Sequence, residues 1–142
     1  MSKYFPLIAL AALGSTSATA HADEATCIAN FKTSGSFFSG KQYQTWLTLG
    51  SVTKSDAFTK IYGSLVKDGW KIGQTDKEVG VISASQEVSY GEGKSAPLNI
   101  LIETEGTQTK ATATFTTSGG VAAKAASVQK SLCGYLTSAE AK

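Results

Sequence analysis

The chain has 142 residues, of which 42% are hydrophobic, and its 13 basic and 11 acidic residues give a formal net charge of +2. All the basic residues are lysines, and they are scattered along the chain rather than clustered. Arginine is the usual residue for bidentate binding of phosphate and carboxylate groups. The composition therefore argues against a nucleic-acid-binding protein and against a clamp for an anionic ligand.

The first 20 residues have the pattern of a secretory signal peptide. Lys3 supplies a positive start, residues 5–13 are apolar, and small residues at 18–20 and 20–22 form two alternative cleavage sites. The apolar stretch is about half of the ~20 residues that a membrane span requires. Cys27 lies too far from either site to be the lipid-modified cysteine of a lipoprotein. We expect cleavage at about residues 20–22 and a soluble periplasmic or secreted bacterial protein, with no transmembrane span and no lipid anchor.

Cys27 and Cys133 are the only cysteines. In a chain bound for an oxidising compartment, an even number of cysteines predicts a structural disulfide. A redox or metal-binding pair would call for Cys-x-x-Cys spacing or histidine partners. The single histidine, His21, lies at the predicted cleavage site.

Residues 23–41 precede the main domain. Residues 23–31 have the pattern of a short helical turn, with two acidic residues at its start. Residues 32–41 (KTSGSFFSGK) are rich in glycine and serine, which favours an irregular lead-in, with an edge segment as the alternative. A single domain is expected over residues 42–138, followed by a tail at 139–142.

The domain opens with a strand and a helix. Residues 43–49 alternate as in a strand, with Leu47 on one face and Trp46 on the other. Thr53 or Ser55 is expected to cap the following helix, and Asp68-Gly69 to end it. The apolar stripe of this helix consists of Phe58, Ile61, Tyr62, Leu65 and Val66.

Four more strands are expected after this helix. The first begins at Trp70, and a tight turn leads to the second at 81–88. A loop over 89–97 precedes a hairpin whose pairing follows from a two-residue turn at Gly106-Thr107. In that register the opposed pairs are Leu98 with Phe115 on an apolar surface, and Leu101 with Thr112 and Glu103 with Lys110 on a polar surface.

A second amphipathic helix closes the chain, with a seam of Val121, Ala125, Val128, Leu132 and Leu136. The predicted fold is α+β, with a five-stranded antiparallel sheet in the order β-α-β-β-β-β-α and both helices on one face. The residues expected in its core are Phe58, Ile61, Leu65, Trp70, Ile82, Leu98, Ile100, Ile102, Phe115 and Leu132.

Two short motifs carry a family resemblance. The helix that ends in Asp68-Gly69-Trp70 and the strand Gly80-Val81-Ile82-Ser83-Ala84 resemble the helix-grip or TBP-like small domains of BamC-type proteins of the bacterial envelope. The resemblance covers about residues 43–138 and implies a similar α+β layout.

The sequence contains none of the common catalytic or metal-binding patterns. Serine–histidine and cysteine–histidine catalysis need an imidazole base, which the predicted domain lacks. The sequence has no zinc cluster, calcium loop or phosphate-binding loop. Glu103 and Glu105 could form a carboxylate pair, but the position of Glu103 opposite Lys110 favours a solvated outer face. We expect no catalytic residue, no metal and no cofactor.

The sequence therefore favours a non-enzymatic envelope protein that binds another, unknown envelope protein or a cell-envelope component. The expected partner surface comprises Trp46, Leu101, Lys110 and Thr112 on the sheet face without helices, and Tyr90 in a glycine-rich loop. Trp46 is either an exposed anchor there or a sign that the two faces of its strand are interchanged.

Two alternatives remain open. One is a carrier for a small apolar ligand, held between sheet and helices in a cavity lined by Phe58, Leu65, Phe115 and Leu132. The other is an enzyme that depends on carboxylates or lysine.

Overall fold

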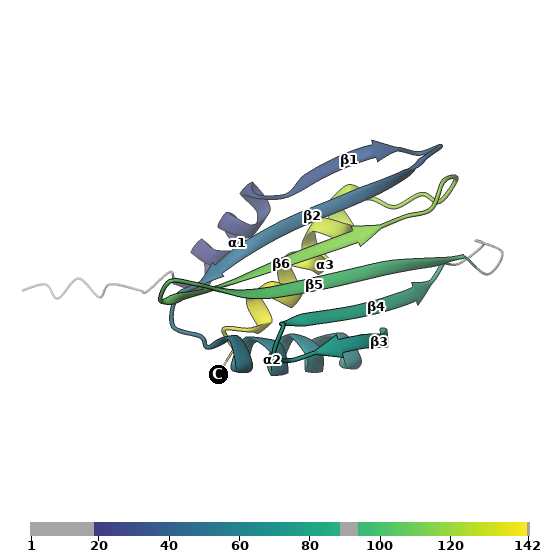
Figure 1. Cartoon of the computed structure of the whole chain (residues 1–142). Coiled ribbons are helices and arrows are strands. Elements are labelled where there is room, and N and C mark those ends of the chain that lie inside the picture. Colours follow the sequence, from purple (N-terminus) through teal and green to yellow (C-terminus); the bar gives the residue numbers. More distant parts are fainter. Residues whose placement is uncertain (1–18, 89–93, 142) are drawn as a thin grey trace, which may run out of the picture.

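The computed structural model describes residues 19–88 and 94–141. The elements follow the order α1 (Thr19–Ala29), β1 (Lys32–Ser36), β2 (Gly40–Leu49), α2 (Lys54–Lys67), β3 (Lys71–Asp76), β4 (Val81–Glu87), β5 (Ser95–Glu105), β6 (Gln108–Thr116) and α3 (Ala125–Ser138). Among the described residues, three helices lie on one side of a single sheet and none lies over the other side (Figure 1). The predicted signal peptide falls outside the described residues, except for Thr19 and Ala20 at the start of α1.

The sheet has six antiparallel strands in the order β1-β2-β6-β5-β4-β3. The prediction of five strands is wrong, because residues 32–36 form an additional edge strand paired with β2. Every residue of β1 is exposed, so this strand has no apolar alternation from which it could be recognised. The hairpin needs Gly35 and Gly40, whose φ angles of 85° and 98° are left-handed.

The hairpin of β5 and β6 has the predicted register. Leu98 is paired with Phe115, Leu101 with Thr112, and Glu103 with Lys110. From Ser95 to Glu103 the inner residues of β5 are buried and the outer ones are exposed. A slip of one residue would bring the apolar set to the solvent side, so the alternation supports the register that the two-residue turn sets.

The α2 helix begins and ends as predicted. Thr53 is its N-cap, and its hydroxyl accepts a hydrogen bond from the Asp56 amide at 3.1 Å. Gly69, at φ 82°, follows the C-cap. Tyr62 and Val66, at the edge of the predicted stripe, are exposed. In α3 the helix begins at Ala125, so Val121 of the predicted seam lies before it.

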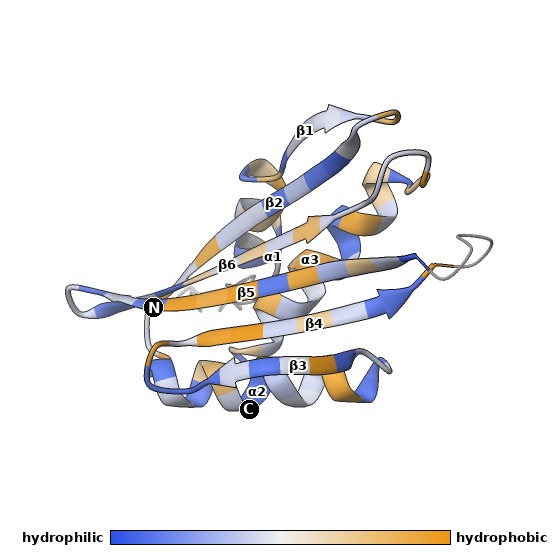
Figure 2. Cartoon of the chain, turned by 45° about the vertical axis from the view of Figure 1, so that its right-hand side comes forward, coloured by the Kyte–Doolittle hydropathy of each residue, from blue (hydrophilic) through white to orange (hydrophobic). Residues whose placement is uncertain are grey.

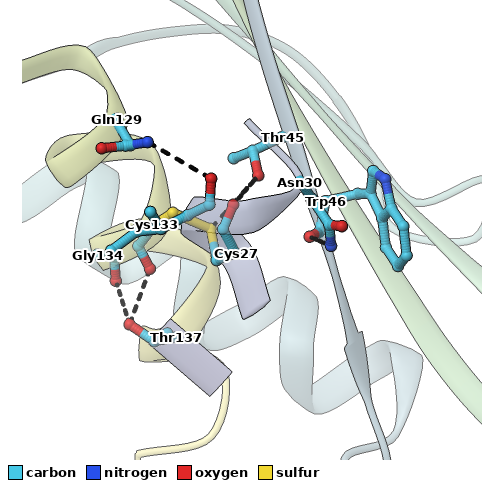
Figure 3. The surroundings of a disulfide bond; sticks show 9 residues. Cys27, Asn30, Thr45, Trp46, Gln129, Cys133, Gly134 and Thr137 are labelled. Atoms are coloured by element: carbon cyan, nitrogen blue, oxygen red, sulfur yellow. Dashed lines mark hydrogen bonds between the residues drawn. A yellow bond between two sulfur atoms is a disulfide. The ribbon is translucent and has the colours of Figure 1, made fainter. Parts of the chain in front are cut away.

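The core lies between the sheet and the helices. Eight of the ten expected core residues are buried, whereas Trp70 and Phe115 are only partly buried and pack against the core. The predicted disulfide is confirmed: it joins Cys27 of α1 to Cys133 of α3, with 5.7 Å between the Cα atoms (Figure 3). In the described part of the chain, no helix has the length and apolar character needed to cross a membrane.

Candidate binding site

The sheet face without helices carries the residues expected to contact a partner. Trp46 lies on this face, with its ring on the opposite side of β2 from the disulfide (Figure 3). The two faces of β2 are therefore as predicted and not interchanged. Trp46 is paired with Thr112, Thr112 with Leu101, and Leu101 with Val81, so these four residues form one row across four strands.

Polar contacts occupy much of this open face. The Lys110 ammonium lies 4.9 Å from the centre of the Trp46 ring, a cation–π contact, and 3.8 Å from the Glu105 carboxylate. The ion pair thus forms with Glu105, although Glu103 is the residue opposite Lys110 in the register. Tyr90, the remaining expected partner residue, lies outside the described residues.

A pocket of about 190 Å³ lies between the sheet and the start of α3. Most of its wall is apolar, formed by Trp70, Phe115, Ala123, Val128, Leu132 and Tyr135. Polar residues complete the lining, namely Gln86, Lys124, Ser127 and Ser131. The small side chain of Ala123, just before α3, leaves space in this wall between the helix and the sheet.

A second hollow of about 300 Å³ shares part of this wall. Gln86, Phe115 and Ala123 line both, and the second hollow continues to Val88 and Val121. Each volume alone is at or below the lower end of the range for ligand sites, which begins at about 300 Å³. Because they share these three lining residues, the two hollows lie next to each other beside the segment that leads into α3.

A chain of hydrogen bonds fixes the aromatic wall of the pocket. The Trp70 indole nitrogen donates to the Tyr135 hydroxyl at 2.8 Å, and that hydroxyl donates to the Asp68 carboxylate at 2.7 Å. Burial, reinforced by the hydrogen bond to Asp68, raises the pKa of Tyr135 to about 12. The hydroxyl therefore stays protonated at neutral pH and donates to Asp68 while it accepts from Trp70.

The cavity differs in part from the one expected from the sequence. Phe115 and Leu132 line the pocket, but Phe58 and Leu65 of α2 are buried in the core and do not. Trp70 and Tyr135 take their place, and their rings meet edge to face with 6.3 Å between centres. The sequence signal for Tyr135 was its position three residues after Leu132, which puts it beside the seam of the helix.

The described residues hold two further features relevant to chemistry. They contain no group of three or more histidine, cysteine, aspartate or glutamate side chains placed to hold a metal ion. Glu140, just after α3, is partly buried next to Asp23 of α1, and burial together with the hydrogen bond to Asp23 raises the pKa of Glu140 to about 7. This carboxyl pair connects the two helices that the disulfide also joins.

Comparisons with known proteins give little further guidance. No protein-family model matches the chain, and no curated protein matches it. Among solved structures, the crystal structure of Ara h 8.0201 is similar to 84% of this chain and 80% of its own length, at 13% sequence identity and a TM-score of 0.39. A likeness of this size supports no argument about fold or function.

Proposed function

We propose that this chain is a non-enzymatic binding protein of an extracytoplasmic compartment that holds a small apolar molecule in the pocket beside Trp70, Phe115 and Tyr135. The observation that carries the proposal is the pocket itself: a concave, mainly apolar site with a few polar groups at its wall, which is the usual composition of ligand sites. An apolar cavity of about 150 Å³ holds a molecule the size of benzene. A ligand with one ring or a short chain therefore fits the pocket, and a longer one would continue into the second hollow.

The expected compartment rests on the leader pattern and on the disulfide. Disulfides persist in oxidising compartments, so the bond between Cys27 and Cys133 is compatible with export to the periplasm or the medium. The resemblance of the Asp68-Gly69-Trp70 motif to BamC-type domains adds an envelope location to the proposal.

A fluorescent apolar probe tests the ligand site directly. N-phenyl-1-naphthylamine, which brightens in apolar surroundings and is long enough to extend from the pocket into the second hollow, should bind the purified chain with saturation. Ser127→Trp places a large ring at the pocket wall and should weaken binding of the probe at least tenfold. Ala126→Trp, at an exposed position of the same helix that does not line the pocket, is the matched control and should leave binding unchanged. Equal effects of the two variants, or no saturable binding, would contradict the proposal.

A second candidate function is the binding of an envelope protein on the open sheet face. It is favoured by the row in which Leu101, 37% exposed, and Trp46 flank Thr112. Aromatic and large apolar residues are the usual anchors of protein interfaces. In this case Trp46→Ala and Leu101→Ala should weaken capture of the partner from envelope extract and leave probe binding intact. Ser127→Trp should weaken probe binding and leave capture of the partner intact.

A further inference from the structure

The turn between β1 and β2 presents two phenylalanines to solvent. Phe38 is 87% exposed, more than any other large hydrophobic side chain that the structure describes, and Phe37 is 45% exposed. Their rings pack edge to face with 5.6 Å between centres. Figure 2 shows this hydrophobic turn at the tip of the hairpin, beyond the body of the sheet. Leaving such a pair in water is unfavourable, so it needs a reason other than the fold.

The backbone of this turn is fixed without help from the two rings. The Ser36 hydroxyl accepts a hydrogen bond from the Ser39 amide at 3.1 Å and lies 2.8 Å from the Ser39 hydroxyl. The Gly120 amide donates to the Phe37 carbonyl at 2.8 Å, which ties the turn to the segment before α3. Polar residues are the common choice for an exposed turn. The phenylalanines are thus held in position on a firm support and are available for contact with something else.

Among the residues that the structure describes, the charges around this end of the molecule are mainly positive. Lys41 follows the turn directly, Lys94 donates to the Gly119 carbonyl at 3.2 Å, and Lys124 precedes α3. The carboxylate of Glu87, where β4 ends, is bound by Lys71 at 2.8 Å. Residues 32–41, which form the hairpin tip and its flanks, contain lysine and no acidic residue.

We propose that this end of the molecule docks on the surface of a lipid bilayer that contains anionic lipids, with Phe37 and Phe38 inserted among the headgroups. A pair of aromatic rings at a protruding tip, flanked by lysines, suits shallow insertion into an interface and electrostatic attraction to anionic headgroups. The turn between β1 and β2 is also only three residues long, whereas a stable protein interface needs about 800 Å² from each partner. The proposal does not depend on the ligand pocket, although Val121 and Ala123 of the adjoining segment line the hollows and would lie near the membrane.

Sedimentation with vesicles tests this docking. The chain, expressed with its own leader and purified in the form that the host produces, should sediment with vesicles of phosphatidylglycerol and phosphatidylethanolamine. It should sediment less with phosphatidylcholine alone or in high salt, because salt screens the lysines. The double variant Phe37→Ser/Phe38→Ser should reduce binding at least tenfold while retaining the melting temperature. Val79→Ser is the matched control: Val79 is 57% exposed on the turn after β3, at the other end of the sheet, and its replacement should change nothing.

A second measurement reports insertion itself. Tryptophan at position 38 (Phe38→Trp) should shift its emission to shorter wavelength on adding anionic vesicles, and brominated lipids should quench it. The Phe37→Ser/Phe38→Ser variant should still bind N-phenyl-1-naphthylamine, so failure of docking and failure of the ligand site can be told apart. Absence of vesicle binding by the unmodified chain, or equal binding by the double variant, would overturn the proposal.

Discussion

The two faces of the sheet are built from alternate residues of the same strands, yet they differ in almost every physical respect. On the helix side, Leu98, Ile100 and Ile102 of β5 are buried under α2 and α3. On the open side, the residues between them, Asn99 and Leu101, are exposed. Polar side chains on this face pair with each other, as Ser83 does with Asn99 at 2.8 Å. An antiparallel sheet tolerates such a division because each strand can be dry on one face and wet on the other.

The two faces of the sheet should therefore contribute differently to the stability of the fold and to binding. The helix-covered face accounts for the hydrophobic core, so substitutions there should act on folding. The open face and the hairpin tip hold exposed apolar side chains whose removal should leave the fold nearly unchanged. Variants of neighbouring residues can therefore separate the two roles.

Removal of the disulfide should have the largest effect on the helix layer. The double variant Cys27→Ala/Cys133→Ala opens a loop of 106 residues, and the loop-entropy model gives an upper estimate of roughly 4–5 kcal/mol for its closure. Denaturant titration measures the loss, and thiol labelling of the unmodified chain without reductant should find no free thiol. A loss below about 1 kcal/mol would mean that the contacts between α1 and α3 suffice without the bond.

The variants Ile100→Ala and Leu101→Ala compare the two faces of the sheet at neighbouring positions of β5. Ile100 is 1% exposed on the helix-covered face, and its truncation should cost about 2–5 kcal/mol, as deletions from filled cores do. Leu101→Ala, on the open face, should cost less than about 1 kcal/mol. Chemical denaturation of both variants gives the two values. Similar losses would mean that the open face is part of the stabilising core.

Tyr135→Phe should have an intermediate effect at the edge of the helix layer. The change removes the donor to Asp68 and the acceptor for Trp70 while keeping the ring. Loss of these two part-buried hydrogen bonds should cost about 1–3 kcal/mol in urea unfolding. Tyr62→Phe, on the exposed edge of α2, is the control and should be nearly neutral. Equal values for the two variants would show that the hydrogen-bond chain contributes no stability.

The smallest expected effect is a dependence of stability on pH from Glu140. The pKa of Glu140 in the folded chain is raised from 4.5 to about 7, so between these values the folded state holds a proton that the unfolded state has lost. The contribution of Glu140 to the free energy of unfolding should therefore be greatest below about pH 4.5 and should fall as the pH rises through 7. Glu140→Gln should flatten the change in melting temperature between pH 5 and pH 8. Glu78→Gln, on an exposed turn, is the control, and an unchanged slope in Glu140→Gln would contradict the assignment.

The parts of the fold that follow from the sequence are those with strict apolar periodicity. The register of the hairpin from Leu98 to Phe115 follows because alternation and turn length agree, and the ends of α2 follow from Thr53 and Gly69. For β1 the sequence left an edge segment only as the alternative to an irregular lead-in, because an edge strand exposed on both faces needs no apolar residue. Without burial on either side, a strand leaves no period of two in its sequence.

The pocket was less predictable because its wall comes from three separate elements. Trp70 follows α2, Phe115 lies on β6 and Tyr135 on α3. Each of the three has the sequence pattern of an ordinary core residue in its own segment. Only the arrangement of these segments in space leaves a gap between their side chains. In contrast, the pairing of Leu101 with Thr112 was predictable from strand alternation and the turn. The position of Trp46 next to Thr112 depends on the register between β2 and β6, which the sequence did not give.

The position of the disulfide has a mechanical consequence. All six strands lie between Cys27 and Cys133 in the chain, from Lys32 to Thr116. Tension applied to the two ends of the chain would pass directly from α1 to α3 through the covalent bond, and the sheet would carry none of it. Pulling on the oxidised protein should therefore lengthen only the segments outside the two cysteines. The reduced protein should yield the extension of the whole domain.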